Sequence, residues 1–260
     1  MDSLQSLFSL RGHIGLVTGA SAGLGVECAH ALALAGADVA VVARRADRVA
    51  ELAKELADKY GVRAIGIGGD VCVEADLERM VSQTRERLGD IDILVNNAGV
   101  SPTGRAEKFT RENWDWSLSV NLTAPMILSQ IVARRLIELK RPGRIINMGS
   151  IYSTVGSSVY RLSAYCATKA AVANLSRQLA IEWARHNILV NTLAPGWIPT
   201  EATEGGIAKP GNKERMELFT PMGRLGTPEE IRGAIIFLAS PASSYVTGSI
   251  LAVDGGHNAW

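Results

Sequence analysis

Two patterns of apolar residues alternate along the chain. Short runs rich in valine and isoleucine predict buried strands, and longer segments with apolar residues every three or four positions predict helices. The predicted strands are His13–Val17, Asp38–Ala43, Arg63–Gly68, Ile93–Asn96, Arg144–Met148, Ile188–Leu193 and Ile250–Val253. The predicted helices are Gly23–Ala35, Ala46–Tyr60, Glu74–Leu88, Asn113–Lys140, Ser163–Arg185 and Pro228–Ala239.

This alternation predicts an α/β fold formed by one Rossmann-type domain over residues 1–260. Its doubly wound parallel sheet would have about seven strands with helices on both faces. Such a sheet binds its ligand at the carboxyl ends of the strands. Residues 196–225, rich in proline and glycine, interrupt the alternation after a predicted strand. An insertion at that end of a sheet predicts a substrate lid.

Composition narrows the class of protein. With 47% hydrophobic and 20% charged residues the chain is globular, and a net charge of +1 argues against binding to nucleic acid or an anionic membrane. No apolar run approaches the roughly 20 residues of a membrane span, and the first residues do not resemble a signal peptide. Three widely spaced cysteines favour a reducing cytoplasm, and four scattered histidines predict no metal site.

A glycine-rich turn, Thr18–Gly25, joins the first predicted strand to the first helix. Glycines at this place allow a tight turn and a close approach of a pyrophosphate, which then lies at the helix N-terminus. The alternative is a turn with a purely structural role. The dinucleotide contacts expected within the turn are Gly19, Ser21, Gly23, Leu24 and Gly25.

The end of the second predicted strand bears on the choice of dinucleotide. An acidic residue there would bind the ribose hydroxyls of NAD, but Ala43 occupies the position and Arg44 and Arg45 follow it. Arginine suits a 2′-phosphate, so NADP is the preferred cofactor and NAD remains possible. The two arginines could instead only solvate the start of a helix.

Tyr165 and Lys169 stand four residues apart in a predicted helix, so a phenol and an ammonium share one helical face. A neighbouring cation stabilises phenolate, which predicts a tyrosine pKa below its reference of about 10. Such a tyrosine could exchange a proton near neutral pH. The same spacing is common on solvated helices, so its context decides its meaning.

Several motifs appear in an order typical of one family. The chain resembles the short-chain dehydrogenase/reductase family over essentially its full length. The resemblance implies an NAD(P)-dependent oxidoreductase, usually a tetramer, that moves a hydride between nicotinamide and a secondary alcohol or ketone. The matching motifs are Thr18–Gly25, Asp70-Val71, Asn96–Gly99, Asn121, Ser150, Tyr165/Lys169, Pro195-Gly196 and Val253–Gly256.

The resemblance also implies four catalytic residues. Ser150 would hydrogen-bond the substrate oxygen, and Tyr165 would donate or accept the proton. Lys169 would hold the nicotinamide ribose and lower the pKa of Tyr165, while Asn121 would hold a water that links Lys169 to solvent.

The remaining cofactor contacts implied by the resemblance form an adenine pair, a central group that also steadies the sheet, and a nicotinamide group. In that order they are Asp70 and Val71; Asn97, Ala98 and Gly99; and Pro195, Gly196, Ile198 and Thr200. Tyr165 and Lys169 are also expected to contact the cofactor.

The catalytic serine has two candidates. The family usually places it twelve or thirteen residues before the tyrosine, which fits Ser153. Ser150, however, directly follows the predicted strand Arg144–Met148 through Gly149, where the family's serine lies. We therefore expect Ser150 to be the catalytic serine and 157–161 to be a small loop insertion.

Pro125 lies four residues after Asn121 within a predicted helix. Proline has no N–H, so the Asn121 carbonyl loses its helical partner and the helix tends to kink. The freed carbonyl could accept a hydrogen bond from a relay water. A kink without function is an equal alternative.

The substrate is less constrained. Leu7–Gly12 and Pro195–Glu201 look similar to sugar-acid dehydrogenases of the gluconate 5-dehydrogenase type, and the whole chain is almost as similar to 3-oxoacyl-thioester reductases. A catalytically silent nucleotide-binding scaffold is a further alternative. Apolar side chains in the insertion could cover a bulky ketone or pack between subunits: Trp197, Ile207, Met216, Leu218 and Phe219.

The C-terminal segment predicts self-association. Ile250–Val253 is expected at the edge of the sheet, where unpaired backbone groups are exposed, and Trp260 would be a large apolar end. Burial of both against a symmetry mate favours a homotetramer. The alternative is a disordered tail on a smaller oligomer.

Overall fold

A parallel sheet of seven strands forms the centre of the computed structural model, which describes residues 3–259. The strand order is β3-β2-β1-β4-β5-β6-β7, and every neighbouring pair is parallel. The order reverses between β1 and β4, the position where such sheets open a crevice for a ligand. The strands are β1 (Ile14–Thr18), β2 (Asp38–Ala43), β3 (Ala64–Gly68), β4 (Ile93–Asn96), β5 (Gly143–Met148), β6 (Ile188–Pro195) and β7 (Ile250–Val253).

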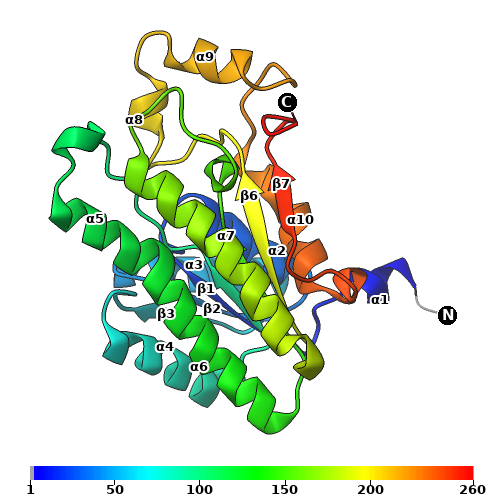
Figure 1. Cartoon of the computed structure of the whole chain (residues 1–260). Helices are drawn as coiled ribbons and strands as arrows, with labels where there is room; N and C mark the ends of the chain where they lie inside the picture. The colour runs from blue at the N-terminus through cyan, green and yellow to red at the C-terminus, as the bar shows by residue number, and fades with distance from the viewer. Residues whose placement is uncertain (1–2, 260) are drawn as a thin grey trace.

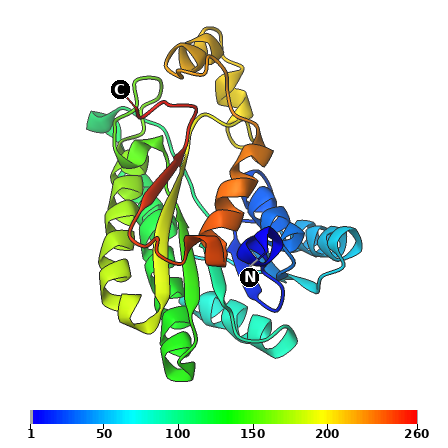
Figure 2. The ribbon, with the colours of Figure 1, turned by 90° about the vertical axis from the view of Figure 1, so that its right-hand side faces the viewer.

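Helices cover both faces of this sheet (Figures 1 and 2). α2, α3 and α10 pack on one face, and α4, α6 and α7 pack on the other. The α-helices are α1 (Leu4–Phe8), α2 (Leu24–Leu34), α3 (Ala46–Tyr60), α4 (Glu74–Arg87), α5 (Arg111–Leu118), α6 (Ala124–Leu139), α7 (Ser163–Trp183), α8 (Glu204–Ile207), α9 (Asn212–Leu218) and α10 (Arg232–Ala239). The predicted doubly wound α/β class is confirmed.

Neighbouring strand residues supply two separate apolar cores. Val39 and Val41 belong to the core beneath α2, α3 and α10, whereas Ala40 and Val42 belong to the core beneath α4, α6 and α7. Successive side chains of a strand point to opposite faces, so a strand buried on both sides is apolar at most of its positions. This requirement explains the continuous apolar runs in the sequence.

The long helix predicted for 113–140 is interrupted. α5 begins at Arg111 after Thr110, whose side chain accepts a hydrogen bond from the Asn113 N–H, and a π turn over Ser119–Thr123 separates it from α6. Pro125 is the second residue of α6. Because Pro125 has no N–H, the regular ladder cannot continue through this point, and hydrogen bonds to the fifth residue replace part of it. The break therefore lies where Pro125 predicts it.

One stretch bears on the expected absence of a membrane-length apolar segment. The continuous helical stretch Arg111–Leu139 is long and apolar enough to cross a membrane by length and composition, but half of its most apolar window is buried in the protein. Core helices meet the same criterion, so the finding is weak evidence for a membrane span.

A buried line of polar side chains crosses the sheet between β4 and β5. Asn96 and Asn147 are register partners, and the Asn96 Nδ2 donates to the Asn147 Oδ1 at 2.8 Å. Asn96 Nδ2 also lies 3.0 Å from the Ser129 hydroxyl of α6, and Asn147 Nδ2 donates to the Ser176 hydroxyl of α7 at 2.9 Å. We call Asn96, Asn147, Ser129 and Ser176 the amide line. Each of the four is at most 4% exposed, yet each is hydrogen-bonded.

The segment 196–225 contains the two short helices α8 and α9, which the sequence pattern did not predict. Figure 1 shows both at the top of the molecule, beyond the ends toward which β6 and β7 point. β7 is the edge strand, as expected, and its residues are only partly buried. Trp260 lies outside the described residues.

Candidate active site

A cleft of about 560 Å³ opens at the carboxyl ends of the strands. We call it the strand-end cavity. The glycine-rich turn, the ends of β2, β4, β5 and β6, and the start of segment 196–225 all line it. Seventeen of the eighteen predicted cofactor contacts are among its lining residues: Gly19, Ser21, Gly23, Leu24, Arg44, Arg45, Asp70, Val71, Asn97, Ala98, Gly99, Tyr165, Lys169, Pro195, Gly196, Ile198 and Thr200.

Gly25 is the predicted contact that does not line this cavity. It is buried behind the turn, where an added Cβ would lie 2.4 Å from the Gly19 carbonyl oxygen and 2.5 Å from the Asn97 Nδ2. Gly19 itself has a φ of +68°, and a Cβ there would meet the Ala98 Cα at 2.7 Å. The two glycines therefore allow the turn to pack directly against the end of β4.

Asn97 holds the turn from the neighbouring strand. Its Nδ2 donates to the Thr18 carbonyl at 2.9 Å and to the Gly19 carbonyl at 3.2 Å. The Thr18 hydroxyl in return accepts the N–H groups of Asn97 and Ala98, both at 3.1 Å. These bonds fix the edge of the cavity through backbone groups, independently of any ligand.

The two arginines after β2 have different surroundings. Arg45 donates to the Ser21 hydroxyl at 3.1 and 3.2 Å and to the Glu201 carboxylate at 3.0 Å. Arg44 also lines the cavity, but its side chain makes no hydrogen bond or ion pair within residues 3–259. An anion entering beside β2 would therefore meet one arginine that is already engaged and one that is not.

Ser150, Tyr165 and Lys169 meet at the floor of the cavity. Ser150 follows β5, while Tyr165 and Lys169 extend from the first turns of α7. The Ser150 and Tyr165 side chains are hydrogen-bonded. The Lys169 Nζ lies 5.5 Å from the centre of the Tyr165 ring and donates to the Met148 carbonyl oxygen at 2.5 Å.

The pKa of Tyr165 departs from the sequence-based prediction. Burial raises it above the usual value of 10, and the hydrogen bond with Ser150 offsets only part of the effect. The expected lowering by Lys169 is wrong for the protein without a cofactor, because the Lys169 ammonium is directed at the Met148 carbonyl. Burial also lowers the pKa of Lys169 to about 8, so this cation is itself easily lost.

Asn121 lies behind these three side chains and does not line the cavity. Its Oδ1 accepts the Val100 N–H at 2.9 Å, and its Nδ2 donates to the Val100 carbonyl at 2.9 Å and to the Thr168 hydroxyl at 3.0 Å. The side chain is therefore occupied by protein partners. The group of Asn121 left to hold a relay water is its backbone carbonyl, which lies within the π turn.

Ser150 and Ser153 face different surroundings. Ser150 lines the cavity, whereas the Ser153 hydroxyl accepts the Ser150 N–H at 3.1 Å. Ser153 thus holds the backbone of Ser150 from behind. The loop between Ser153 and α7 is held by the Ser157 hydroxyl, which donates to the Tyr152 hydroxyl at 3.0 Å.

A second cleft of about 700 Å³ adjoins the first. We call it the outer cavity. Ser150, Tyr165, Gly196 and Ile198 line both. The outer cavity also has three cationic side chains, Arg105, Arg161 and Lys209, and no aspartate or glutamate among its lining residues. Sequence reasoning missed these cations because no spacing in the chain connects them.

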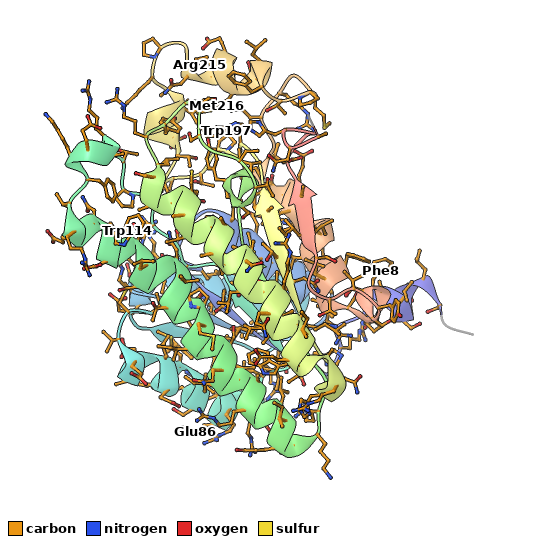
Figure 3. All side chains as sticks on the ribbon, in the orientation of Figure 1. Phe8, Glu86, Trp114, Trp197, Arg215 and Met216 are labelled. Atoms are coloured by element: carbon orange, nitrogen blue, oxygen red, sulfur yellow. The ribbon has the colours of Figure 1, made fainter. Side chains whose placement is uncertain are left out.

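Aromatic side chains form one side of the outer cavity. The Trp197 ring packs edge-to-face against Tyr152 and Tyr160, with ring centres 5.8 and 5.9 Å apart. Figure 3 shows Trp197 below Met216 and Arg215 of α9. Of the five apolar residues predicted to cover a ketone, only Trp197 and Ile207 line this cavity; Met216 is buried, and Leu218 and Phe219 are exposed.

Across residues 3–259, histidine, cysteine and acidic side chains form no group of three or more that could hold a metal ion.

The comparisons with known proteins cover nearly the whole chain. The family model described as enoyl-(acyl carrier protein) reductase matches residues 19–258. Gluconate 5-dehydrogenase from Gluconobacter oxydans is 40% identical over 254 residues, with 98% of each chain covered. The 3-oxoacyl-[acyl-carrier-protein] reductase from Aquifex aeolicus is 35% identical, with 95% of this chain and 98% of that protein covered.

A solved structure is similarly close. The crystal structure of a gluconate 5-dehydrogenase from Burkholderia cenocepacia in complex with NADP and tartrate superposes with a TM-score of 0.94 at 35% identity. The match covers 99% of this chain and 100% of that one.

Proposed function

Because the chain belongs to the short-chain dehydrogenase/reductase family, we propose that it transfers a hydride between NADP and the carbonyl carbon of an anionic sugar-derived ketone, a keto-sugar acid. The observation that carries this proposal is the outer cavity, where three cations and no carboxylate surround the approach to Ser150 and Tyr165. The grouping of Ser150, Tyr165 and Lys169 also speaks against a silent nucleotide-binding scaffold.

The strand-end cavity suits a dinucleotide. Gly23 has a φ of +62°, and a Cβ there would reach the Thr200 side chain at 3.2 Å, closing the gap between the turn and segment 196–225. Glycine keeps this passage open. Arg44 and Arg45 support NADP over NAD, because a 2′-phosphate needs a cationic partner at the end of β2.

Three side chains would carry the chemistry. The bound reduced nicotinamide supplies the hydride. Ser150 donates a hydrogen bond to the substrate oxygen, and Tyr165 gives that oxygen its hydroxyl proton as the carbon–oxygen double bond becomes a single bond. The raised pKa of Tyr165 keeps the phenol protonated at neutral pH, which suits a proton donor. Lys169 binds the nicotinamide ribose, and the Asn121 backbone carbonyl holds the relay water.

The substrate class follows from the outer cavity's charge. Arg161 and Lys209 make no side-chain hydrogen bond or ion pair within residues 3–259, and Arg105 has only a 3.8 Å pair with Glu107. A carboxylate on the substrate would compensate these charges. The aromatic wall of Tyr152, Tyr160 and Trp197 would cover its carbon chain.

A screen of NADPH oxidation tests this proposal. Keto-sugar acids should be reduced with a much higher kcat/KM than uncharged ketoses of the same length, and Arg161→Gln should raise KM for the acids by about tenfold. Lys213→Gln is the control, because it removes the charge of a lysine in α9 that does not line the cavity. Preference for 3-oxoacyl thioesters would instead favour a 3-oxoacyl-thioester reductase, and no oxidation of NADPH with any ketone would contradict the proposal.

The cofactor preference has its own test. Ala43→Asp combined with Arg44→Leu removes a phosphate partner and introduces a carboxylate. The ratio of kcat/KM for NADPH to that for NADH should fall more than tenfold, because one charge-assisted hydrogen bond is worth roughly 1.5–3 kcal/mol. A parent protein that already prefers NADH would show that the end of β2 was misinterpreted.

Residues 196–225 are proposed as the substrate lid of this single domain. They contribute Trp197 and Ile207 to the outer cavity, and α8 and α9 lie beyond the strand ends. We also propose a cytoplasmic location, which is supported by Cys28, Cys72 and Cys166 being free thiols.

A homotetramer is the proposed assembly. β7 is an edge strand with partly exposed residues, and Ile181 of α7 is 75% exposed. A subunit packed over these residues would bury both. Light scattering at micromolar concentration tests this: four times the mass of one chain is expected, and a monomer would exclude it.

A further inference from the structure

Glu201 connects the two sides of the cleft. Its carboxylate accepts hydrogen bonds from Arg45 at 3.0 Å and from Arg48 at 2.7 Å. Arg45 precedes α3 and Arg48 lies in its first turn, whereas Glu201 belongs to the proposed lid, more than 150 residues later in the chain. We call these two ion pairs the Glu201 clamp.

The same guanidinium that binds Glu201 also belongs to the cofactor side. The Arg45 Nε and a terminal nitrogen reach the Ser21 hydroxyl, and that nitrogen lies 3.4 Å from the Ser21 carbonyl. Ser21, Arg44 and Arg45 all line the strand-end cavity. A phosphate that binds beside Arg45 at the end of β2 would therefore share a guanidinium that the clamp already occupies.

Charge makes this sharing unfavourable. The hydrogen bonds from Arg48 and Arg45 hold the pKa of the Glu201 carboxyl below its usual value, so Glu201 is anionic at neutral pH. A phosphate beside Arg45 would add two negative charges close to this carboxylate. Either Arg45 divides its hydrogen bonds between two anions, or the clamp opens.

We propose that Glu201 is a specificity-determining residue that competes with the 2′-phosphate of the cofactor for Arg45. A dinucleotide without that phosphate leaves the clamp intact, and one whose 2′-phosphate binds Arg45 as well as Arg44 must displace or weaken the clamp. Glu201 thus reduces the preference for NADP that Arg44 and Arg45 provide. The inference rests on the proposed use of a dinucleotide at this cavity.

Two nucleotides that differ by one phosphate test the competition. Adenosine 2′,5′-bisphosphate and adenosine 5′-monophosphate are titrated calorimetrically into the full-length protein and into Glu201→Gln. Glu201→Gln should tighten the bisphosphate by about three- to tenfold, the range expected for two solvent-exposed ion pairs, and should leave the monophosphate within about twofold.

Glu204→Gln is the matched control. Glu204 carries the same charge in the same segment and makes no ion pair within residues 3–259, so its loss should change neither affinity. A second check combines Glu201→Gln with Arg45→Gln. The effect of Glu201→Gln should shrink in that background, because the guanidinium for which Glu201 and the phosphate compete is gone.

Three results would overturn the inference: equal changes for the two nucleotides, no change in Glu201→Gln, or an equal gain in Glu204→Gln. Failure of the proposed cofactor preference looks different. In that case the bisphosphate would bind no more tightly than the monophosphate in the parent protein and in Glu201→Gln alike. If the parent protein prefers the bisphosphate and Glu201→Gln leaves that preference unchanged, the cofactor proposal stands and only the role of Glu201 is excluded.

Discussion

An added Cβ at Gly25, behind the glycine-rich turn, would lie 2.4 Å from a carbonyl oxygen, whereas one at Gly205 in α8 would meet no atom within 4 Å. The cofactor side of the cleft is thus built from tightly packed backbone at strand ends. The substrate side is built from short helices, aromatic rings and exposed cations. A site can therefore keep one ligand geometry fixed while the opposite wall varies its side chains.

The largest expected effect lies where the two sides meet. Tyr165→Phe removes the proton donor and leaves the ring in place, so kcat should fall by about 10²–10⁴-fold while the dissociation constant of NADPH changes little. Stopped-flow turnover and fluorescence titration measure the two quantities. Tyr152→Phe, a neighbouring ring in edge contact with Tyr165, should keep kcat within a few fold. Near-normal turnover of Tyr165→Phe would remove this residue from the chemistry.

Substitution of Ser150 and of Ser153 distinguishes a side chain that contacts the substrate from one that supports the backbone behind it. Ser150→Ala removes a donor to the substrate oxygen and should lower kcat by about 10²–10³-fold. Ser153→Ala loses only the acceptor for the Ser150 N–H, so we expect less than a tenfold loss in the same steady-state assay. If Ser153→Ala were the more damaging change, spacing from the tyrosine would be a better guide than position after β5.

Lys169, on the cofactor side of the cleft, is expected to lower the stability of the folded protein. Its pKa is about 8 in the folded protein and 10.5 in the unfolded reference, so between these values the unfolded chain binds more protons and stability rises with pH. Below about pH 8 the full penalty is present, on the order of 3 kcal/mol. Lys169→Met should therefore abolish turnover yet raise the free energy of unfolding at pH 7, with the gain shrinking toward pH 10.

Urea denaturation at both pH values measures this gain, with Lys54→Met on the exposed side of α3 as the control. A Lys169→Met protein that is less stable at pH 7, or a difference that does not vary with pH, would contradict the buried ammonium as the source of the penalty.

The smallest effect tests the packing contrast itself. Gly25→Ala forces a methyl group against the Gly19 carbonyl and should destabilise the protein by about 1–3 kcal/mol and weaken NADPH binding. Gly205→Ala should leave both the free energy of unfolding and NADPH binding nearly unchanged. Thermal unfolding with and without NADPH measures the pair. Similar losses in both variants would mean that the two sides of the cleft are equally tightly packed.

Much of the fold could be predicted because its causes are local. β2, β4 and β7 have the predicted bounds, because each is a short, mainly apolar run that the sequence itself displays. Pro125 likewise marked the break between α5 and α6. α8 and α9 were missed because both are too short to show an apolar period, and two of the four residues of α8 are glycines.

The sequence predicted which residues line the cofactor cavity but not which side chains they pair with. The motifs brought Ser21, Arg44 and Arg45 to one cavity, yet no local pattern could pair Arg45 with Glu201. The same limit applies to Tyr165: the spacing to Lys169 is visible in the sequence, but burial, which raises the pKa of the phenol, depends on the whole fold.

The amide line has a consequence for how the chain assembles. Apart from Asn96, Asn147 and Arg144 at the start of β5, β4 and β5 have only apolar residues and one glycine, so hydrophobic burial alone would accept a slipped alignment almost as readily. A slip by one residue would strand the Asn96 and Asn147 amides in an apolar interior without partners, at a cost of several kcal/mol. It would also shift Gly149 and Ser150 by about 3.3 Å along the strand direction relative to β4. The buried amides thus specify the register of β4 and β5, and only correctly aligned chains would present Ser150 beside Tyr165.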